Sequence, residues 1–131
     1  MHIRSIYEEH YLGETYRTGV AYLRARNEGD DRAPRRVGDY SLARQREFIA
    51  KAARAQGVII IAEYIEYGDQ EGYRPAFTSA VTFMSETGVP DLFVAREAYL
   101  ARRQSDFRLF METLKNSRIE LVTAIDRWKQ Y

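Results

Sequence analysis

The sequence contains no cysteine and only two histidines, and these shortages exclude several kinds of chemistry. A chain without cysteine has no disulfide, no thiolate metal site and no cysteine nucleophile. Both histidines, His2 and His10, lie near the N-terminus, which argues against a histidine-bound zinc ion and against a catalytic triad. We therefore expect no metal site built from these residue types.

Long apolar runs and glycine-rich phosphate loops are missing as well. No hydrophobic run approaches the roughly 18 residues that cross a membrane. Residues 1–17 are charged and lack the apolar core of a signal peptide, so we expect a cytoplasmic protein without membrane contact. The loop after the first apolar segment has neither of the glycine patterns of dinucleotide-binding and P-loop proteins, and we expect no cofactor.

What the chain does contain is enough for one folded domain. It has 131 residues, of which 45% are hydrophobic, and this suffices for a core. The formal net charge is +1, so attraction to a nucleic acid would have to come from local clusters of basic residues. We divide the chain into an N-terminal extension, residues 1–17, and a folded core, residues 18–131.

Hydrophobic patterning predicts strands that alternate with helices. The first helix is expected to begin after Asp39 or Ser41 and to end at Gly57, and the second to begin at Pro75 and stop at Gly88. This alternation predicts a three-layer α/β/α fold with an open, mostly parallel sheet of four to five strands. The expected strands are residues 18–24, 58–65, 91–95 and 118–125, and the third helix is expected to begin at Ser105 or Asp106.

Arginines recur at the carboxyl ends of the expected strands and in the loops that follow. Ligands of parallel sheets bind at this edge, and the N–H donors of arginine match phosphate oxygens. A phosphate site is one interpretation, and surface arginines paired with Asp or Glu are the other. The acidic residues around the end of the second strand predict either a metal or acid–base site or a solvated loop, and we favour the solvated loop. The arginines are Arg24, Arg26, Arg74, Arg96, Arg102 and Arg103, and the acidic residues are Glu63, Glu66, Asp69 and Glu71.

Five short motifs occur in the order found in a known family. The most specific is SLARQRE at residues 41–47. The others are YLRAR at 22–26, AEYIEYG at 62–68, RPA at 74–76 and AYLAR at 98–102. Over residues 18–126 the chain resembles the N-terminal catalytic domain of the serine recombinases, the resolvase/invertase family.

The resemblance implies a protein that acts on DNA. Family members cut DNA with a serine that attacks a backbone phosphate, and a cage of arginines neutralises this phosphate. Carried over by position, the phosphate-binding residues are Arg24, Arg74 and Arg102, and Glu66 occupies an acidic position of the family. The nucleophile's position holds Arg26, whose permanently charged guanidinium does not attack phosphorus, so we expect no catalytic residue.

A second departure from the family lies in the motif D-R-L-x-R. Ala98 replaces its Asp and Tyr99 replaces its first Arg, while Arg102 matches the second. We therefore regard Arg26, Glu66 and Tyr99 as accessory residues of the site. The helix-turn-helix module that family members carry after this domain is not expected within the 131 residues.

Three functions are open at this point. The favoured one is an inactive resolvase-like domain that binds DNA weakly or indirectly, or binds a protein partner such as an active recombinase; a homodimer is compatible with either role. The second is a sensor that binds a phosphorylated small ligand or a nucleotide at the arginine-rich edge. The third is a protein–protein adaptor that works through residues 1–17 and the loop at 25–40.

Overall fold

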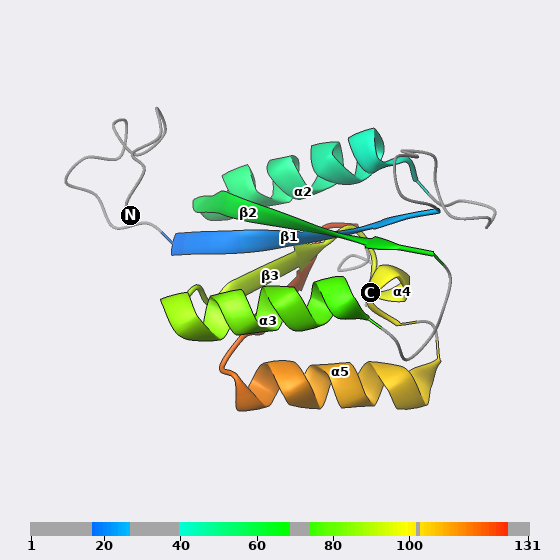
Figure 1. Cartoon of the computed structure of the whole chain (residues 1–131). Coiled ribbons are helices and arrows are strands. Elements are labelled where there is room, and N and C mark those ends of the chain that lie inside the picture. Colours follow the sequence, from blue (N-terminus) through cyan, green and yellow to red (C-terminus); the bar gives the residue numbers. More distant parts are fainter. Residues whose placement is uncertain (1–16, 27–39, 69–73, 102, 126–131) are drawn as a thin grey trace.

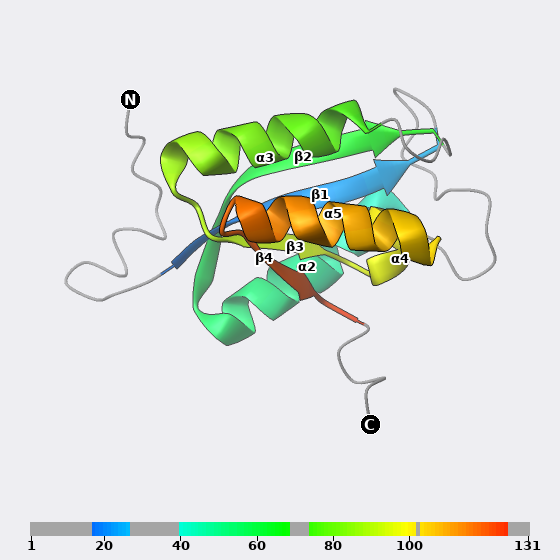
Figure 2. The same ribbon diagram turned by 90° about the horizontal axis from the view of Figure 1, so that it is seen from below.

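The computed structural model describes residues 17–26, 40–68, 74–101 and 103–125, and these form three layers (Figure 1). A four-stranded sheet lies between helix α2 on one face and helices α3 and α5 on the other (Figures 1 and 2). All strand pairs are parallel and the strand order is β2-β1-β3-β4, which confirms the expected three-layer fold. The elements are β1 (Arg17–Ala25), α2 (Leu42–Gln56), β2 (Val58–Tyr67), α3 (Pro75–Thr87), β3 (Asp91–Val94), α4 (Glu97–Leu100), α5 (Gln104–Asn116) and β4 (Glu120–Thr123).

Helix ends follow the local signals in the sequence. Ser41 caps α2, because its hydroxyl accepts a hydrogen bond from the backbone N–H of Arg44 at 3.2 Å. Gly57 ends the same helix with φ 69°, a conformation that glycine adopts without steric cost. Pro75 opens α3 and Gly88 closes it with φ 77°, as the sequence predicts.

Two elements differ from the sequence-based expectation. The last strand is shorter than residues 118–125, since only Glu120–Thr123 pair with β3. A single helical turn, α4, follows β3 and has no counterpart in the expected order. At four residues it is too short for a periodic hydrophobic pattern to reveal. The alternative cap Asp39, residues 1–16 of the expected extension and most of the 25–40 loop lie outside the described residues.

The sheet separates two hydrophobic clusters. On the α2 face, Leu23 and Phe93 pack with Ile49 and Ala53 of the helix. On the other face, the larger cluster joins strands β1 and β3 to α3 and α5; its members include Val20, Tyr22, Phe77, Met84, Leu92, Leu100 and Leu114. Full burial of each large apolar side chain contributes about 1.5–3 kcal/mol. Because β1 is buried on both faces, it reads as a continuous apolar run.

Gly19 lies where β1 is closely packed between β2 and β3. A Cβ at this position would lie 2.9 Å from Cγ1 of Val58, 3.0 Å from the ring of Phe93 and 3.2 Å from the carbonyl oxygen of Asp91. The pairing of β1 with β2 also shifts between Gly19 and Val20, which leaves one extra residue in β2. Beyond this bulge the register is regular and brings Arg24 beside Glu66 at the carboxyl edge.

Candidate functional site

Arg24 lies at the carboxyl end of β1, and its guanidinium turns into the protein. The residue is 6% exposed. Its Nη1 donates to the carbonyl oxygen of Tyr99 at 3.3 Å, and its Nη2 donates to the carbonyl oxygen of Gly68 at 2.5 Å. The side chain therefore ties the end of β1 to the ends of β2 and α4.

Gln45 of α2 holds the backbone of Arg24. Its Oε1 accepts from the N–H of Arg24 at 3.0 Å, and its Nε2 donates to the carbonyl oxygens of Arg24 and Tyr40, each at 2.8 Å. At this point of β1 the pairing with β3 has ended, so Gln45 serves both backbone groups as a neighbouring strand would. Sequence reasoning missed this residue. The available signal was a polar residue at helical spacing between Leu42 and Ile49, both buried.

Arg74 also contacts the carbonyl group of Tyr99, which accepts a hydrogen bond from Arg24. It is 4% exposed and precedes the first residue of α3. Its Nη1 donates to the hydroxyl of Tyr22 at 3.3 Å and to the carbonyl oxygen of Tyr99 at 3.5 Å. The ring of Phe110 lies 5.6 Å from its guanidinium carbon, which is a cation–π distance. Two of the three predicted phosphate-binding arginines thus converge on one carbonyl oxygen.

Glu66 caps α3 from the end of β2. Its Oε1 accepts from the hydroxyl of Tyr22 at 2.9 Å and from the backbone N–H of Phe77 at 3.0 Å, and its Oε2 accepts from the N–H of Ala76 at 3.0 Å. The carboxylate is buried at the helix N-terminus, where the helix dipole favours negative charge. Glu66 therefore fixes the start of α3 and, with it, the neighbouring Arg74.

The tyrosines at this edge are engaged in the structure. Burial raises the pKa of Tyr22 well above its usual range, and the charge of Glu66 raises it further, so the hydroxyl stays protonated. Tyr99 is 3% exposed, and its hydroxyl accepts a hydrogen bond from the backbone N–H of Tyr40 at 2.7 Å. Its carbonyl oxygen accepts hydrogen bonds from the guanidinium groups of Arg24 and Arg74. Both hydroxyls therefore take part in hydrogen bonds within the domain.

The other arginines predicted at this edge do not all lie beside Arg24 and Arg74. Arg26 directly follows β1 and is half-buried; its Nε is buried without a hydrogen-bond acceptor among the described residues. Arg103 is exposed and donates to Asp106 at 3.1 Å, which matches the interpretation of a paired surface arginine. Arg96 lies between β3 and α4 and is half-buried. Arg102 lies outside the described residues.

The acidic residues in and after the second half of β2 have different partners. Glu63 forms a bidentate ion pair with Arg46 of α2, with N–O distances of 2.7 to 3.0 Å. Asp69 and Glu71 lie outside the described residues. In the part of the chain that the structure describes, no group of three or more potential metal ligands is assembled, and no helix is long and apolar enough to cross a membrane.

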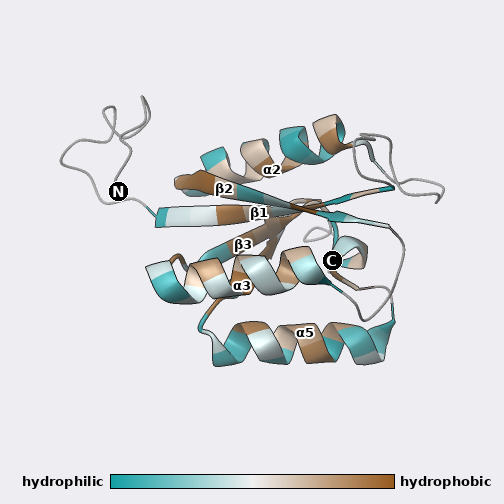
Figure 3. Cartoon of the chain, in the orientation of Figure 1, coloured by the Kyte–Doolittle hydropathy of each residue, from teal (hydrophilic) through white to brown (hydrophobic). Residues whose placement is uncertain are grey.

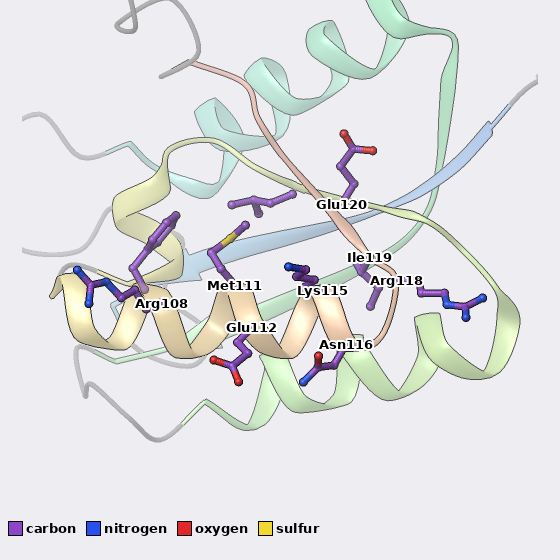
Figure 4. Close-up of a pocket in the computed structure, with 10 residues that line it drawn as sticks. Arg108, Met111, Glu112, Lys115, Asn116, Arg118, Ile119 and Glu120 are labelled. Carbon is purple, nitrogen blue, oxygen red and sulfur yellow. The ribbon is translucent and has the colours of Figure 1, made fainter.

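A separate hollow lies between α5 and the edge strand β4. It encloses about 1010 Å³, and Figure 4 shows Met111, Lys115 and Ile119 among the side chains around it. The hollow is not lined by any of the predicted site residues that the structure describes, which are Arg24, Arg26, Glu66, Arg74 and Tyr99. It is therefore distinct from the place where the arginines meet.

A family model of the resolvase N-terminal domain matches residues 19–130. The chain belongs to the resolvase family of serine recombinases. This match confirms the family predicted from the motifs, and it reaches from within β1 to beyond β4. No match to a curated protein was found.

Solved structures of other recombinase domains share this fold. The N-terminal catalytic domain of TP901-1 integrase superimposes with a TM-score of 0.63 at 19% identity, covering 82% of this resolvase domain and 77% of that chain. A resolvase family site-specific recombinase from Streptococcus pneumoniae gives 0.64 at 19% identity, covering 84% and 73%. The C-terminal catalytic domain of ISC1926 TnpA, an IS607-like serine recombinase, gives 0.63 at 14% identity, covering 82% and 70%.

Within this resolvase domain, the structure explains the most specific motif of the sequence. In SLARQRE, Ser41 caps α2 and Gln45 holds the backbone of Arg24. The motif therefore works by building the helix and by positioning the carboxyl end of β1. The strand motif contributes the hydroxyl of Tyr22, which contacts both Glu66 and Arg74.

Proposed function

We propose that this resolvase domain is catalytically inactive and retains the ability to bind DNA phosphate. The observation that carries the proposal is Arg26, which follows β1 at the position that the resemblance assigns to the nucleophilic serine. A guanidinium keeps its proton at all physiological pH values and is not a nucleophile. The domain would contact DNA weakly, or would bind a partner such as an active recombinase.

The contacts of Arg24 and Arg74 support a phosphate site. Their Nη1 atoms lie within 3.5 Å of one carbonyl oxygen, so two guanidinium groups are held together at the edge where parallel sheets bind ligands. Arg26 adds a third positive charge two residues beyond Arg24. We include Arg102 from its position in the family motif. Convergent guanidinium groups would neutralise a phosphate without a metal ion.

The hydroxyl side chains that could substitute for the missing serine already form hydrogen bonds within the domain. Tyr22 donates to a buried carboxylate, and burial raises the pKa of its hydroxyl. The hydroxyl of Tyr99 is held by the backbone of Tyr40. Ser41 holds the first turn of α2. These contacts support a domain that binds DNA without cleaving it.

A nicking assay tests the absence of cleavage. Supercoiled plasmid is incubated with a large excess of the protein and resolved for nicked or linear forms, and protein–DNA adducts are trapped with denaturant. We expect only supercoiled DNA and free protein. A covalent adduct between this chain and a broken DNA strand would refute the proposal.

A matched pair of charge reversals tests phosphate binding. Arg26→Glu changes the proposed site, whereas Arg108→Glu makes the same change on the exposed surface of α5. Affinity for a short duplex is measured at two salt concentrations, because each lost phosphate contact lowers the salt slope by about one. We expect Arg26→Glu to weaken binding at least about tenfold and Arg108→Glu to leave it nearly unchanged. Equal losses in both variants would contradict a site at the carboxyl edge.

A further inference from the structure

Positive charge is concentrated on one of the three longer helices. Helix α2 holds four basic residues and one acidic residue, a formal charge of +3. Helix α5 holds two basic and two acidic residues, and α3 holds one acidic residue and no basic one. Figure 3 shows hydrophilic residues in teal along α2, on the opposite side of the sheet from α3 and α5. Among the described helices, net positive charge therefore lies on the α2 face of the sheet.

Three of the basic residues form a stripe on the exposed side of α2. Arg44, Lys51 and Arg54 follow one another at intervals of seven and three residues, which keeps them on one face of the helix. All three are exposed, whereas Gln45 and Ile49 on the opposite side of the helix are buried. At 1.5 Å per residue, the stripe is about 15 Å long. It therefore extends over most of the length of α2.

The acidic groups of the described residues leave most of this charge unneutralised. Arg46, on another side of the helix, bonds to Glu63 at 2.7 to 3.0 Å. Arg44 contacts Glu47 through a single pair of atoms 3.4 Å apart, and both side chains are more than half exposed. No carboxylate of the described residues forms an ion pair with Lys51 or Arg54. Within the described ranges, the stripe therefore keeps its positive charge.

Arg44 is positioned by two aromatic rings. Its guanidinium carbon lies 4.9 Å from the ring centre of Phe48 and 6.0 Å from that of Tyr40. The two rings pack edge to face with their centres 5.0 Å apart. The side chain of Arg44 is nevertheless 55% exposed. A guanidinium stacked on a ring keeps the N–H donors of its edge available, so Arg44 is oriented to donate to an external phosphate.

The stripe starts at the edge of the sheet where the phosphate site is proposed. Gln45, in the first turn of α2, bonds to the backbone of both Arg24 and Tyr40. Arg44 precedes Gln45 and lies near the same carboxyl edge, whereas Arg54 lies in the last turn of the helix. Each DNA strand carries one phosphate per about 3.4 Å of the duplex axis, so the stripe matches the length of about four phosphates. A duplex bound at the edge and lying along α2 would place further phosphates beside the stripe.

We propose that Arg44, Lys51 and Arg54 bind the phosphate backbone of DNA, next to the phosphate that is held at the carboxyl edge. This inference rests on the proposed function, because it extends that site along the same duplex. Arginine and lysine bind phosphate oxygens without reading the bases, so the stripe adds affinity and orientation but no sequence preference. The formal net charge of the whole chain is only +1, so a local cluster of this kind supplies the attraction to DNA.

A nucleic acid fits the stripe better than an acidic protein does. The exposed neighbours of the stripe on α2 include Ala43, Ala50 and Ala55, which have no hydrogen-bonding side chain and little apolar area. Protein partners are usually held by aromatic or aliphatic anchors in the centre of the interface. Aligned charges with small residues beside them instead suit a regular row of phosphates.

Matched double charge reversals on two helices test the stripe. Lys51→Glu with Arg54→Glu changes α2, and Arg108→Glu with Lys115→Glu makes the same change on the exposed surface of α5. Arg54 and Lys115 both lie in the last turn of their helices, so the effect of the helix dipole is matched as well. Affinity for a short duplex of mixed sequence is measured by fluorescence anisotropy over a range of salt concentrations.

We expect the α2 variant to bind at least about tenfold more weakly at low salt and to lower the salt slope by about two, because two phosphate contacts are lost. The α5 variant should bind nearly as well as the unmodified chain. Circular dichroism checks that both variants are folded. The milder pair Lys51→Gln with Arg54→Gln should lower the slope in the same direction if the glutamates disturb the helix. An α2 variant that binds as tightly as the α5 variant would overturn the inference.

Arg26→Glu, measured in the same assay, separates this inference from the proposed function. If Arg26→Glu weakens binding and the α2 variant does not, the stripe is refuted and the site at the carboxyl edge stands. If only the α2 variant weakens binding, the stripe is supported and the site at the edge is refuted. An unmodified chain that binds no DNA at low salt would overturn both, and would leave an acidic protein as the candidate partner of α2.

Discussion

The two ends of the parallel sheet treat buried charge in different ways. At the amino end, Arg17 and Asp91 form a bidentate pair, with Nε–Oδ2 and Nη2–Oδ1 distances of 3.0 and 2.7 Å, and Oε2 of Glu120 lies 3.9 Å from Nη2 of Arg17. At the carboxyl end, Arg24 and Arg74 are both buried and both donate to a neutral carbonyl oxygen. The amino end therefore holds ion pairs of one arginine with the first residues of two other strands, and the carboxyl end is a network of buried hydrogen bonds.

This difference indicates that the hydrogen bonds at the carboxyl end depend on the whole fold more than the ion pairs at the amino end do. Arg17 has a half-exposed side chain, so water can solvate its charge if the pair breaks. The hydrogen bonds and charge of Asp91 raise the pKa of Arg17, which favours the charged guanidinium. The carboxyl network instead joins β1, β2, α2, α3 and α4 through buried side chains, so loss of one member removes a hydrogen-bond partner from several buried groups.

The largest expected effect comes from removing the carboxylate of the network. Glu66→Ala leaves two N–H groups of α3 and the hydroxyl of Tyr22 without their acceptor and removes a buried negative charge near Arg74. We expect the free energy of unfolding to fall by about 3–5 kcal/mol, as for other broken buried charge networks. Urea unfolding measures it. A loss below about 1 kcal/mol would show that water replaces the carboxylate.

Gln45→Leu should have the second largest effect. Leucine fills the space but leaves the N–H and C=O of Arg24 unpaired in the interior, which costs about 1–3 kcal/mol. Lys51→Ala, on the exposed face of the same helix, is the control and should change stability by no more than about 0.5 kcal/mol. Equal effects of the two substitutions in urea unfolding would mean that Gln45 does not support β1.

Tyr22 should make stability depend on alkaline pH. Burial raises the pKa of its hydroxyl in the folded chain, so the unfolded chain releases this proton first as the pH passes about 10. The stability contributed by the protonated hydroxyl is complete below that pH and is lost as the pH rises. We expect the unmodified chain to lose up to about 1.4 kcal/mol per pH unit more than Tyr22→Phe. Identical pH profiles from thermal or urea unfolding would rule out this linkage.

The amino end should respond least. Arg17→Met removes the bidentate partner of Asp91, but the exposed position of Arg17 lets water reach the site. We expect a smaller loss of stability than for Gln45→Leu, and a smaller one in high salt, where surface charges are screened. A loss as large as that of Glu66→Ala would remove the distinction between the two ends.

Much of the architecture was predictable because it depends on local sequence patterns. Apolar strands and capped helices predict their own positions, and the layered parallel fold follows from their alternation. The helix α4 was missed, since one turn carries no periodic signal. At the site, the convergence of Arg24 with Arg74 was predictable from strand ends and family motifs. The bonds of Gln45 and the capping role of Glu66 were not.

The sequence by itself determined the family and the alternation of the strands with the longer helices. Only the tertiary structure decided what the buried polar groups bind. Arg24 and the carbonyl of Tyr99 are 75 residues apart in the chain, and Tyr22 and Glu66 are 44 apart. Local patterning describes which face a residue takes, whereas a hydrogen bond depends on where distant strand ends meet once the sheet has formed.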